Sequence, residues 1–422
     1  HFPRDGQALA TARRRLVFGE LLALLLGMGL LRHRQADGQA PRCMPEFDFA
    51  PFYASLPYAP TGAQRRAVAE AAADMARAVP MNRLIEGDVG SGKTTVAAAL
   101  CVLAHAGGLQ SALMAPTEIL AAQHAQNLER LLASSGLRVG LLTGGLSAAQ
   151  KREAKAAIAD GSVGLVVGTH ALLQEDVAFR RLGLVITDEQ HRFGVAQRAA
   201  LAAKGGAGAG ASAAPHMLIM SATPIPRTLS LMVYGDLDVS VLDELPAGRQ
   251  PIKTYLVGGG LRARVRRFLR AQMEQGRQAY VVCPLVEADE SGLAAAVQLR
   301  DELAAADFAE LPVGLLHGRM PAREKEQVMR AFAAGDLKLL VSTTVIEVGV
   351  DVPNATVMVV ENAERFGLSQ LHQLRGRVGR GAAQSHCILI SDAEDAATRE
   401  RLQVLCKTAD GFAIAEQDLR LR

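Results

Sequence analysis

The chain has 422 residues, of which 49 % are hydrophobic, and this length and composition suit two or three domains with full cores. Its net charge is only +3, from 46 basic and 43 acidic residues, so overall charge does not indicate a nucleic-acid partner and any basic surface must be local. Aromatic residues make up 4 % of the chain and Trp is absent, which argues against a broad base-stacking platform. The five cysteines are scattered and form no C-x-x-C pair, so the sequence gives little support for metal or disulfide sites and suits a reducing cytoplasm.

An almost uninterrupted apolar run at 16–31 follows three consecutive arginines at 13–15. A twin-arginine or secretory signal is one interpretation of this pattern. Glu20 inside the run, the lack of an A-x-A site after it and its short length for a membrane span favour a buried helix without membrane contact. We expect residues 1–55 to be the trailing helix and linker of an upstream domain.

The segment 87–94 reads Gly-Asp-Val-Gly-Ser-Gly-Lys-Thr and fits G-x-x-x-x-G-K-[ST], the phosphate-binding loop of nucleoside triphosphatases. The residues expected to bind the nucleotide here are Gly87, Asp88, Val89, Gly90, Ser91, Gly92, Lys93 and Thr94. The glycines allow backbone N–H groups to point at phosphate oxygens, Lys93 can reach the β- and γ-phosphates, and the Thr94 hydroxyl can ligate Mg²⁺. A strand predicted at 83–85 and a helix at 93–106 argue against a chance Gly-rich turn, because a helix N-terminus then faces the phosphates.

Strands and helices alternate along the rest of the chain. We predict strands at 111–115, 139–142, 163–167, 184–187, 218–220, 279–283, 313–316, 337–342, 356–360 and 387–390, and helices at 117–135 and 147–161. Ser147 and Gln150 form a capping box for the second of these helices, and the Gly/Ala-rich stretch 204–215 is interpreted as a surface loop. The pattern pauses near 245–248. It therefore predicts an α/β fold with two parallel-sheet domains flanked by helices, at 56–245 and 246–422, and a nucleotide held between them.

Four polar residues follow the strand predicted at 184–187, at the carboxyl end where ligands bind in open α/β sheets: Asp188, Glu189, Gln190 and His191. Asp188 can hold Mg²⁺, and Glu189 can polarise the water that attacks the γ-phosphate. An exposed polar turn is the alternative interpretation, and the phosphate-binding loop upstream argues against it.

The second half contains three arginines and three glycines within Gln370-Leu371-His372-Gln373-Leu374-Arg375-Gly376-Arg377-Val378-Gly379-Arg380-Gly381. A solvated basic turn is one interpretation. Alternatively, Arg377 and Arg380 stabilise charge on the γ-phosphate when the two halves close, as arginine fingers do.

Seven stretches together resemble the motifs of superfamily 2 helicases, in that family's order across 56–390. They are the loop at Gly87, Ala115-Pro116-Thr117-Glu118, Gly168-Thr169-His170, Asp188 to His191, Ser221-Ala222-Thr223-Pro224, Ser342 to Asp351, and Gln370 to Gly381. Within the superfamily, the runs beginning at Gly87, Asp188, Ala222 and Asp243 look like RecG-type ATP-dependent DNA translocases. The transcription–repair coupling translocases are also similar, but they usually carry a second Glu where Gln190 stands.

The resemblance implies two tandem RecA-like domains that use ATP and Mg²⁺ to move on branched or double-stranded DNA in repair and recombination, as a monomer in the bacterial cytoplasm. It implies that Gln64 reads the adenine edge, and that Gln190 and Gln373 lie on the γ-phosphate side. Asp351 would approach the ribose or the closing arginines. Coupling between the domains would fall to Ser221 and Thr223, and DNA backbone contacts to Thr117, Thr169, Arg319, Thr343 and Thr344. For Gln64 and each hydroxyl, the alternative is a helix cap or turn.

RecG-type proteins carry a DNA-binding wedge domain before the motor and a Thr-Arg-Gly coupling motif after it. Neither is found in this sequence, which starts with His1 and stops within a helical pattern at Arg422, so we expect a fragment. A nucleotide-dependent scaffold and an RNA helicase are functions of other classes. The intact Glu189, Arg377 and Arg380 argue against a scaffold, and the residues 188–194 fit the DNA branch better than the RNA branch.

Overall fold

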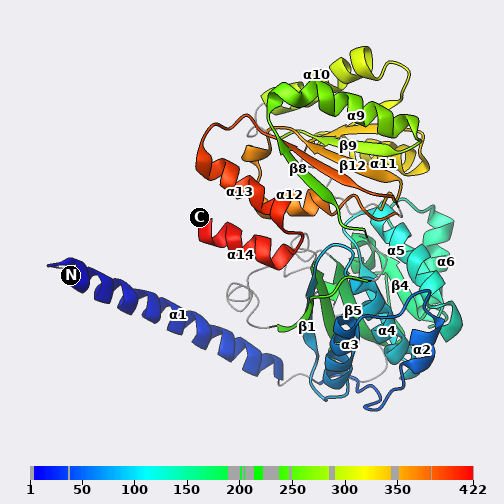
Figure 1. Ribbon diagram of the computed structural model, residues 1–422. Coiled ribbons are helices and arrows are strands. Elements are labelled where there is room, and N and C mark those ends of the chain that lie inside the picture. Colours follow the sequence, from blue (N-terminus) through cyan, green and yellow to red (C-terminus); the bar gives the residue numbers. More distant parts are fainter. Residues whose placement is uncertain are drawn as a thin grey trace.

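The computed structural model describes residues 4–36, 39–188, 200–201, 204, 213–221, 237–246, 250–284, 290–343, 351–381 and 383–421. Two parallel β-sheets, each flanked by helices, form two lobes that lie against each other (Figure 1). The predicted α/β fold with two parallel-sheet domains is confirmed.

The first lobe contains a seven-stranded sheet in the order β3-β4-β2-β5-β6-β1-β7, with neighbouring strands parallel. Its strands are β1 (Asn82–Gly87), β2 (Gln110–Met114), β3 (Val139–Leu142), β4 (Leu165–Gly168), β5 (Leu182–Asp188), β6 (His216–Ser221) and β7 (Asp238–Leu242). Its helices are α2 (Ala50–Ser55), α3 (Gly62–Met75), α4 (Lys93–Ala106), α5 (Glu118–Leu131) and α6 (Ala148–Ala159). Strands β2 and β4 are buried along their whole length, as their apolar composition predicts for strands between two helical layers.

The second lobe contains a six-stranded sheet in the order β10-β11-β9-β12-β13-β8, again with parallel neighbours. Its strands are β8 (Lys253–Val257), β9 (Gln278–Val282), β10 (Val313–Leu316), β11 (Leu339–Ser342), β12 (Ala355–Val360) and β13 (His386–Ile390). Its helices are α9 (Arg262–Glu274), α10 (Glu290–Glu302), α11 (Ala322–Ala334), α12 (Leu368–Arg375), α13 (Ala396–Lys407) and α14 (Gly411–Leu421).

Two strands were not predicted from the sequence, β7 and β8, and both lie at a sheet edge. Neither is buried along its whole length. Polar residues stand within β7 (Asp238 and Ser240) and β8 (Lys253 and Thr254), so both strands lack the mostly apolar run by which the other strands were recognised. The predicted pause near 245–248 falls between these two strands.

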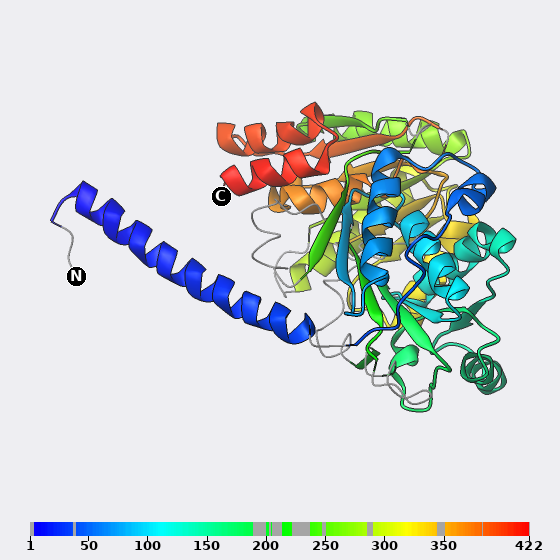
Figure 2. The same cartoon turned by 90° about the horizontal axis from the view of Figure 1, so that it is seen from below.

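The helix expected at 16–31 is present, but the prediction that it is buried is wrong. Helix α1 (Gly6–Ala36) extends away from both lobes (Figures 1 and 2), and the exposed fractions of Leu16, Phe18 and Leu30 are 70 %, 65 % and 68 %. Both faces of each sheet already carry a core of this chain's own side chains, which leaves α1 no open apolar face there. No described helix combines the length and hydropathy needed to cross a membrane.

The segment between α1 and α3 lies on the first lobe. Backbone N–H groups of Ala40 and Cys43 donate to the carbonyls of Ala78 and Met75, and Cys43 and Phe52 belong to the first lobe's core. The division of the chain at residues 55 and 245 stays a prediction. The loop expected at 204–215 falls largely outside the described residues.

Candidate nucleotide site and inter-lobe cleft

The strand register brings the predicted site residues of the first lobe to one edge of its sheet. Asp188 lies opposite Met220 on β6, and Ser221 lies opposite Glu86 on β1, so the carboxyl ends of β1, β5 and β6 are adjacent. The phosphate-binding loop follows β1 directly. Ligands bind at this edge in open parallel sheets, and the register therefore assembles a candidate nucleotide site.

The loop between β1 and α4 has the backbone that its glycines permit. Gly90 and Gly92 have φ angles of 82° and 85°, a conformation that L side chains rarely adopt. The Lys93 ammonium donates to the carbonyl oxygens of Gly87 and Asp88 at 2.7 and 2.9 Å, so it is held within the loop at the start of α4. A cation, a helix N-terminus and a row of backbone N–H groups then converge on the position that suits a phosphate.

Gln64 joins helix α3 to this loop. Its Oε1 accepts from the Thr61 N–H at 3.0 Å while the Thr61 hydroxyl accepts from the Gln64 N–H, which is a complete capping box. Its Nε2 donates to the Ser91 carbonyl at 2.8 Å, and the side chain is buried. The capping alternative is therefore present in the structure, and the contact with adenine stays a prediction.

Asp188 lies at the end of β5 with its Oδ2 2.8 Å from Nε2 of His124 on α5. Burial by itself would raise the pKa of this carboxyl, but the hydrogen bond and charge of His124 outweigh it. The positive charges of Lys93 and Arg377 act in the same direction, so the pKa of Asp188 lies below its usual value. Asp188 is thus an ionised carboxylate beside the loop, a suitable oxygen ligand for a divalent cation.

The second lobe approaches the loop through helix α12. His372 Nε2 lies 2.7 Å from Oδ1 of Asp88, and the same oxygen accepts from the Val89 N–H at 2.7 Å. Burial of the Asp88 carboxyl opposes ionisation, but its bonds with His372 and Val89 and the charge of Lys93 lower its pKa. The structure therefore connects the two lobes at the loop itself.

The arginines predicted as fingers lie on the same side of the second lobe. Arg377 is buried, and its positive charge acts on Asp188 across the lobe boundary. Arg380 Nη1 lies 3.4 Å from Oδ1 of Asp351. The Asp351 backbone exchanges hydrogen bonds with the Gln123 side chain of α5, at 3.0 and 3.3 Å. Asp351 thus lies beside Arg380 and against the first lobe.

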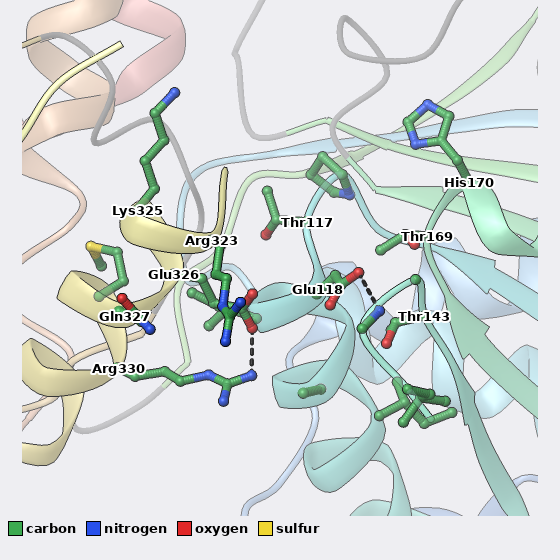
Figure 3. A pocket seen from close by; sticks show the side chains of 18 of the residues that line it. Thr117, Glu118, Thr143, Thr169, His170, Arg323, Lys325, Glu326, Gln327 and Arg330 are labelled. Carbon is green, nitrogen blue, oxygen red and sulfur yellow. Dashed lines mark hydrogen bonds and ion pairs between the residues drawn. The ribbon is translucent and has the colours of Figure 1, made fainter. Parts of the chain in front are cut away.

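A second feature is a cavity of about 930 Å³ between the two lobes. Thr117, Glu118 and Thr169 line it from the first lobe, while Arg323 and Arg330 of α11 line it from the second (Figure 3). Glu118 Oε1 accepts from the Gly145 N–H at 2.8 Å, which fixes the loop that forms one wall. Two of the threonines predicted to contact DNA therefore line one cleft.

The loops on the two sides of this cleft share a sequence pattern. Strands β3 and β10 both read Val-Gly-Leu-Leu, and each is an edge strand of its sheet. In each lobe a lysine of the following helix donates to the carbonyl of a glycine seven residues earlier: Lys151 to Gly144 and Lys325 to Gly318, both at 2.6 Å. The lobes thus present matching loops, built in the same way.

The remaining predicted residues are placed less favourably or lie outside the description. Thr343 is fully buried, and the structure describes no hydrogen-bond partner for its hydroxyl, which does not suit the DNA contact expected of it. Arg319 is exposed at the β10–α11 loop, and Gln373 is partly buried on α12. Glu189, Gln190, Thr223 and Thr344 lie outside the described residues.

Sequence reasoning assigned no role to His124, His372 or Arg375, although the two histidines contact the site and Arg375 contacts His372. His372 and Arg375 stand three residues apart within the run already singled out, so they share one face of α12. That spacing was the available signal. No comparable signal marks His124, because its partner lies 64 residues away along the chain.

Comparison with known proteins gives consistent results. A family model of the DEAD/DEAH box helicase matches residues 61–232, and one of the helicase conserved C-terminal domain matches residues 261–382. The chain is 51 % identical to the ATP-dependent DNA helicase RecG of Synechocystis sp. and 48 % identical to that of Bacillus subtilis, over 100 % of this chain in both cases. It spans 50 % and 61 % of the lengths of these two relatives. A solved structure of RecG bound to a three-way DNA junction aligns with a TM-score of 0.88 and 43 % identity, over 100 % of this chain and 55 % of that one.

Proposed function

Because the chain belongs to the RecG-type superfamily 2 helicases, we propose that it is the two-lobe motor of an ATP-dependent translocase acting on branched or double-stranded DNA. The observation that carries this proposal is the convergence of Lys93, Asp188 and Arg377, from both lobes, on one phosphate-binding loop. A site of this kind can hydrolyse a nucleoside triphosphate only when the lobes are together, which links chemistry to lobe motion. In this proposal the motor is a monomer of the bacterial cytoplasm, where its DNA would be found.

Each side chain has a chemical task in the proposed reaction. Lys93 binds the β- and γ-phosphates, and Arg377 and Arg380 stabilise the charge that builds up on the γ-phosphate. Glu189 orients the attacking water and accepts its proton. Gln190 and Gln373 hold the γ-phosphate side, and Ser221 and Thr223 couple the two lobes.

The donor set of the loop fits Mg²⁺. The Thr94 hydroxyl and the Asp188 carboxylate supply two hard oxygen ligands, which suits an ion that usually keeps several waters and phosphate oxygens. When bound, Mg²⁺ would offset part of the negative charge of the phosphates. His124 holds the Asp188 carboxylate in position and favours its ionised form.

The inter-lobe cleft is the proposed path of DNA. Hydroxyls, glycine-rich loops and the cations of α11 line it, and such groups suit contacts to phosphates rather than to base edges. The matching loops of the two lobes would contact the DNA backbone at two points. Binding by this cleft is therefore expected to be independent of sequence and to weaken steeply with salt. The structure-specific part of fork recognition is assigned to a wedge domain of the whole protein.

One comparison of substrates tests the proposal. ATP turnover is measured with a synthetic fork, linear duplex, single strands and RNA, using Lys93→Ala as the inactive control. We expect stimulation by fork and duplex DNA above that by RNA. Stimulation by RNA alone would identify an RNA helicase, and nucleotide binding without turnover would identify a scaffold. Preference for linear duplex over the fork would favour the transcription–repair coupling type.

A further inference from the structure

Three side chains form a continuous hydrogen-bonded chain from the second lobe to the phosphate-binding loop. Arg375 Nη2 lies 2.8 Å from Nδ1 of His372, whose Nε2 lies 2.7 Å from Oδ1 of Asp88. His372 and Arg375 are both buried. The site chemistry proposed above uses neither of them, so their contacts require a separate explanation.

The chemistry of arginine fixes the direction of each hydrogen bond. A guanidinium has only donors, so Nδ1 of His372 must accept, and the imidazole proton must lie on Nε2. Nε2 then donates to the Asp88 carboxylate, which also accepts from the Val89 N–H. A protonated imidazole would place an N–H against the guanidinium. The chain of bonds therefore requires a neutral His372 in one tautomer.

Arg375 is itself anchored where two helices of the second lobe meet. Its Nη1 donates to the carbonyls of Leu405 and Thr408 at 2.9 Å, and its Nη2 donates to the carbonyl of Ala409 at 3.1 Å. These carbonyls belong to the end of α13 and the turn into α14, and α12, α13 and α14 all pack on one another. A shift of the α13–α14 junction would therefore move Arg375.

The same helix end also packs closely on the loop. A Cβ added at Gly376 would lie 2.9 Å from Cβ of Val89, so the backbone at the end of α12 approaches the residue after Asp88 without room for a side chain. If packing were the only requirement at this contact, apolar side chains would serve it without the cost of burying charged and polar groups. A buried chain of matched donors and acceptors specifies one relative position instead.

We propose that His372 is a positioning residue that couples the α13–α14 junction to the phosphate-binding loop through Arg375 and Asp88. The purpose of this coupling depends on the proposed ATP hydrolysis, but the contacts that make it do not. When the junction is in the position seen here, His372 holds Asp88 and hence the Val89 N–H, and the loop is ordered for phosphate. When the junction moves, the bond to Asp88 is released and the lobes separate at the loop.

The test compares His372→Ala, His372→Gln and a matched control in the 422-residue chain. Glutamine can donate from Nε2 to Asp88 and accept at Oε1 from Arg375, so it should restore part of the function. The control is Gln278→Ala, because the buried Gln278 side chain of β9 also donates to two carbonyls of the second lobe, those of Phe332 and Leu337, and is described in no contact with the loop, α13 or α14. Where the alanine variant does not fold, His372→Phe keeps a ring in place and removes both hydrogen bonds.

Two measurements are made on each variant. Turnover at saturating ATP should fall about tenfold for His372→Ala, the factor expected for one hydrogen bond to a charged group, while KM changes by less than about twofold. Hydrogen exchange should speed up at residues 87–92 in His372→Ala but only near residues 332–337 in Gln278→Ala. The exchange measurement needs no catalysis, so it decides the coupling even if the chain hydrolyses no ATP. Unchanged exchange in the loop of His372→Ala, or the same loop response in Gln278→Ala, would overturn the proposal.

Discussion

Substitution of Gly92 by alanine tests whether the phosphate-binding loop and helix α3 are built as one unit. Gly92 has a φ of 85°, and a Cβ at this position would lie 2.1 Å from Nε2 of Gln64. The Gln64 amide would have to move, which breaks its bond to the Ser91 carbonyl and its bond to the Thr61 N–H. The substitution therefore acts on the cap of α3 as well as on the loop.

The expected loss of stability is the sum of three contributions. A left-handed backbone costs an L residue about 1–2 kcal/mol, and loss of each of the two Gln64 side-chain hydrogen bonds costs about 0.5–1.5 kcal/mol. Gly92→Ala should thus lower the free energy of unfolding by about 2–5 kcal/mol. Gly136→Ala is the matched control, since its φ is 69° and no atom lies within 4 Å of an added Cβ. It should cost only the backbone contribution and leave ATP turnover unchanged.

Urea unfolding and ATP turnover are measured for both glycine variants and for the double variant Gln64→Ala/Gly92→Ala. Removing the Gln64 amide removes the clash, so the losses of stability should be less than additive. If Gly92→Ala unfolds at the same urea concentration as Gly136→Ala and hydrolyses ATP normally, Gln64 and the loop are independent and the reasoning fails.

The other predictions concern single groups of the site. Glu189→Gln should keep ATP affinity and slow turnover by orders of magnitude; loss of affinity with unchanged turnover of bound ATP would make Glu189 a ligand instead. Arg380→Ala should reduce turnover far more than ATP affinity, whereas an unchanged rate would assign this arginine to DNA or to solvent. The pKa of Asp188 is lowered in the fold, so its ionised carboxylate contributes to stability above the usual aspartate pKa, and this contribution is lost as pH falls through the lowered pKa. His124→Ala should raise the pKa of Asp188 and shift the acid limb of the pH profile of turnover to higher pH. If the acid limb does not move, His124 does not act on Asp188 in this way. Lys151→Met and Lys325→Met should each weaken DNA binding about threefold to tenfold by freeing a loop of the cleft, while Lys155→Met, whose Nζ pairs with Asp176, should not.

The sequence predicted those elements best whose residues form a mostly apolar run. The bounds expected at 93–106, 139–142 and 313–316 are those of α4, β3 and β10. Mostly apolar runs between turn residues leave little freedom in where such elements begin and end, and this holds even for β3 and β10, which are partly buried edge strands. Strands β7 and β8 were missed because polar residues interrupt or precede their apolar residues, and α1 was wrongly expected to be buried because hydropathy does not say what covers a helix.

The contacts of the candidate site are of two kinds: some join residues close in the sequence, and others join residues far apart in it. The phosphate-binding loop and the capping residues follow from spacing, because each is made within a few residues of the chain. The bond between His372 and Asp88 joins residues 284 positions apart, and the one between Gln123 and Asp351 joins residues 228 apart. Such pairs depend on how the two lobes meet, which no local pattern in one sequence specifies. Prediction of their partners therefore required the structure.

Helix α5 links the nucleotide site to the inter-lobe cleft. Its first residue, Glu118, holds the Gly145 loop of the cleft, and Ile119 packs against the core of the second lobe. One to two turns later, Gln123 bonds the backbone of Asp351 and His124 bonds Asp188. A helix moves nearly as a rigid body, so a displacement of Asp188 or Asp351 during the nucleotide cycle is transmitted to the cleft wall over a short distance. His372 contacts the same site from α12, and through Arg375 it connects the loop to the end of α13 and the turn into α14. The loop is therefore held between two elements, one that leads to the proposed DNA path and one that leads to the α13–α14 junction.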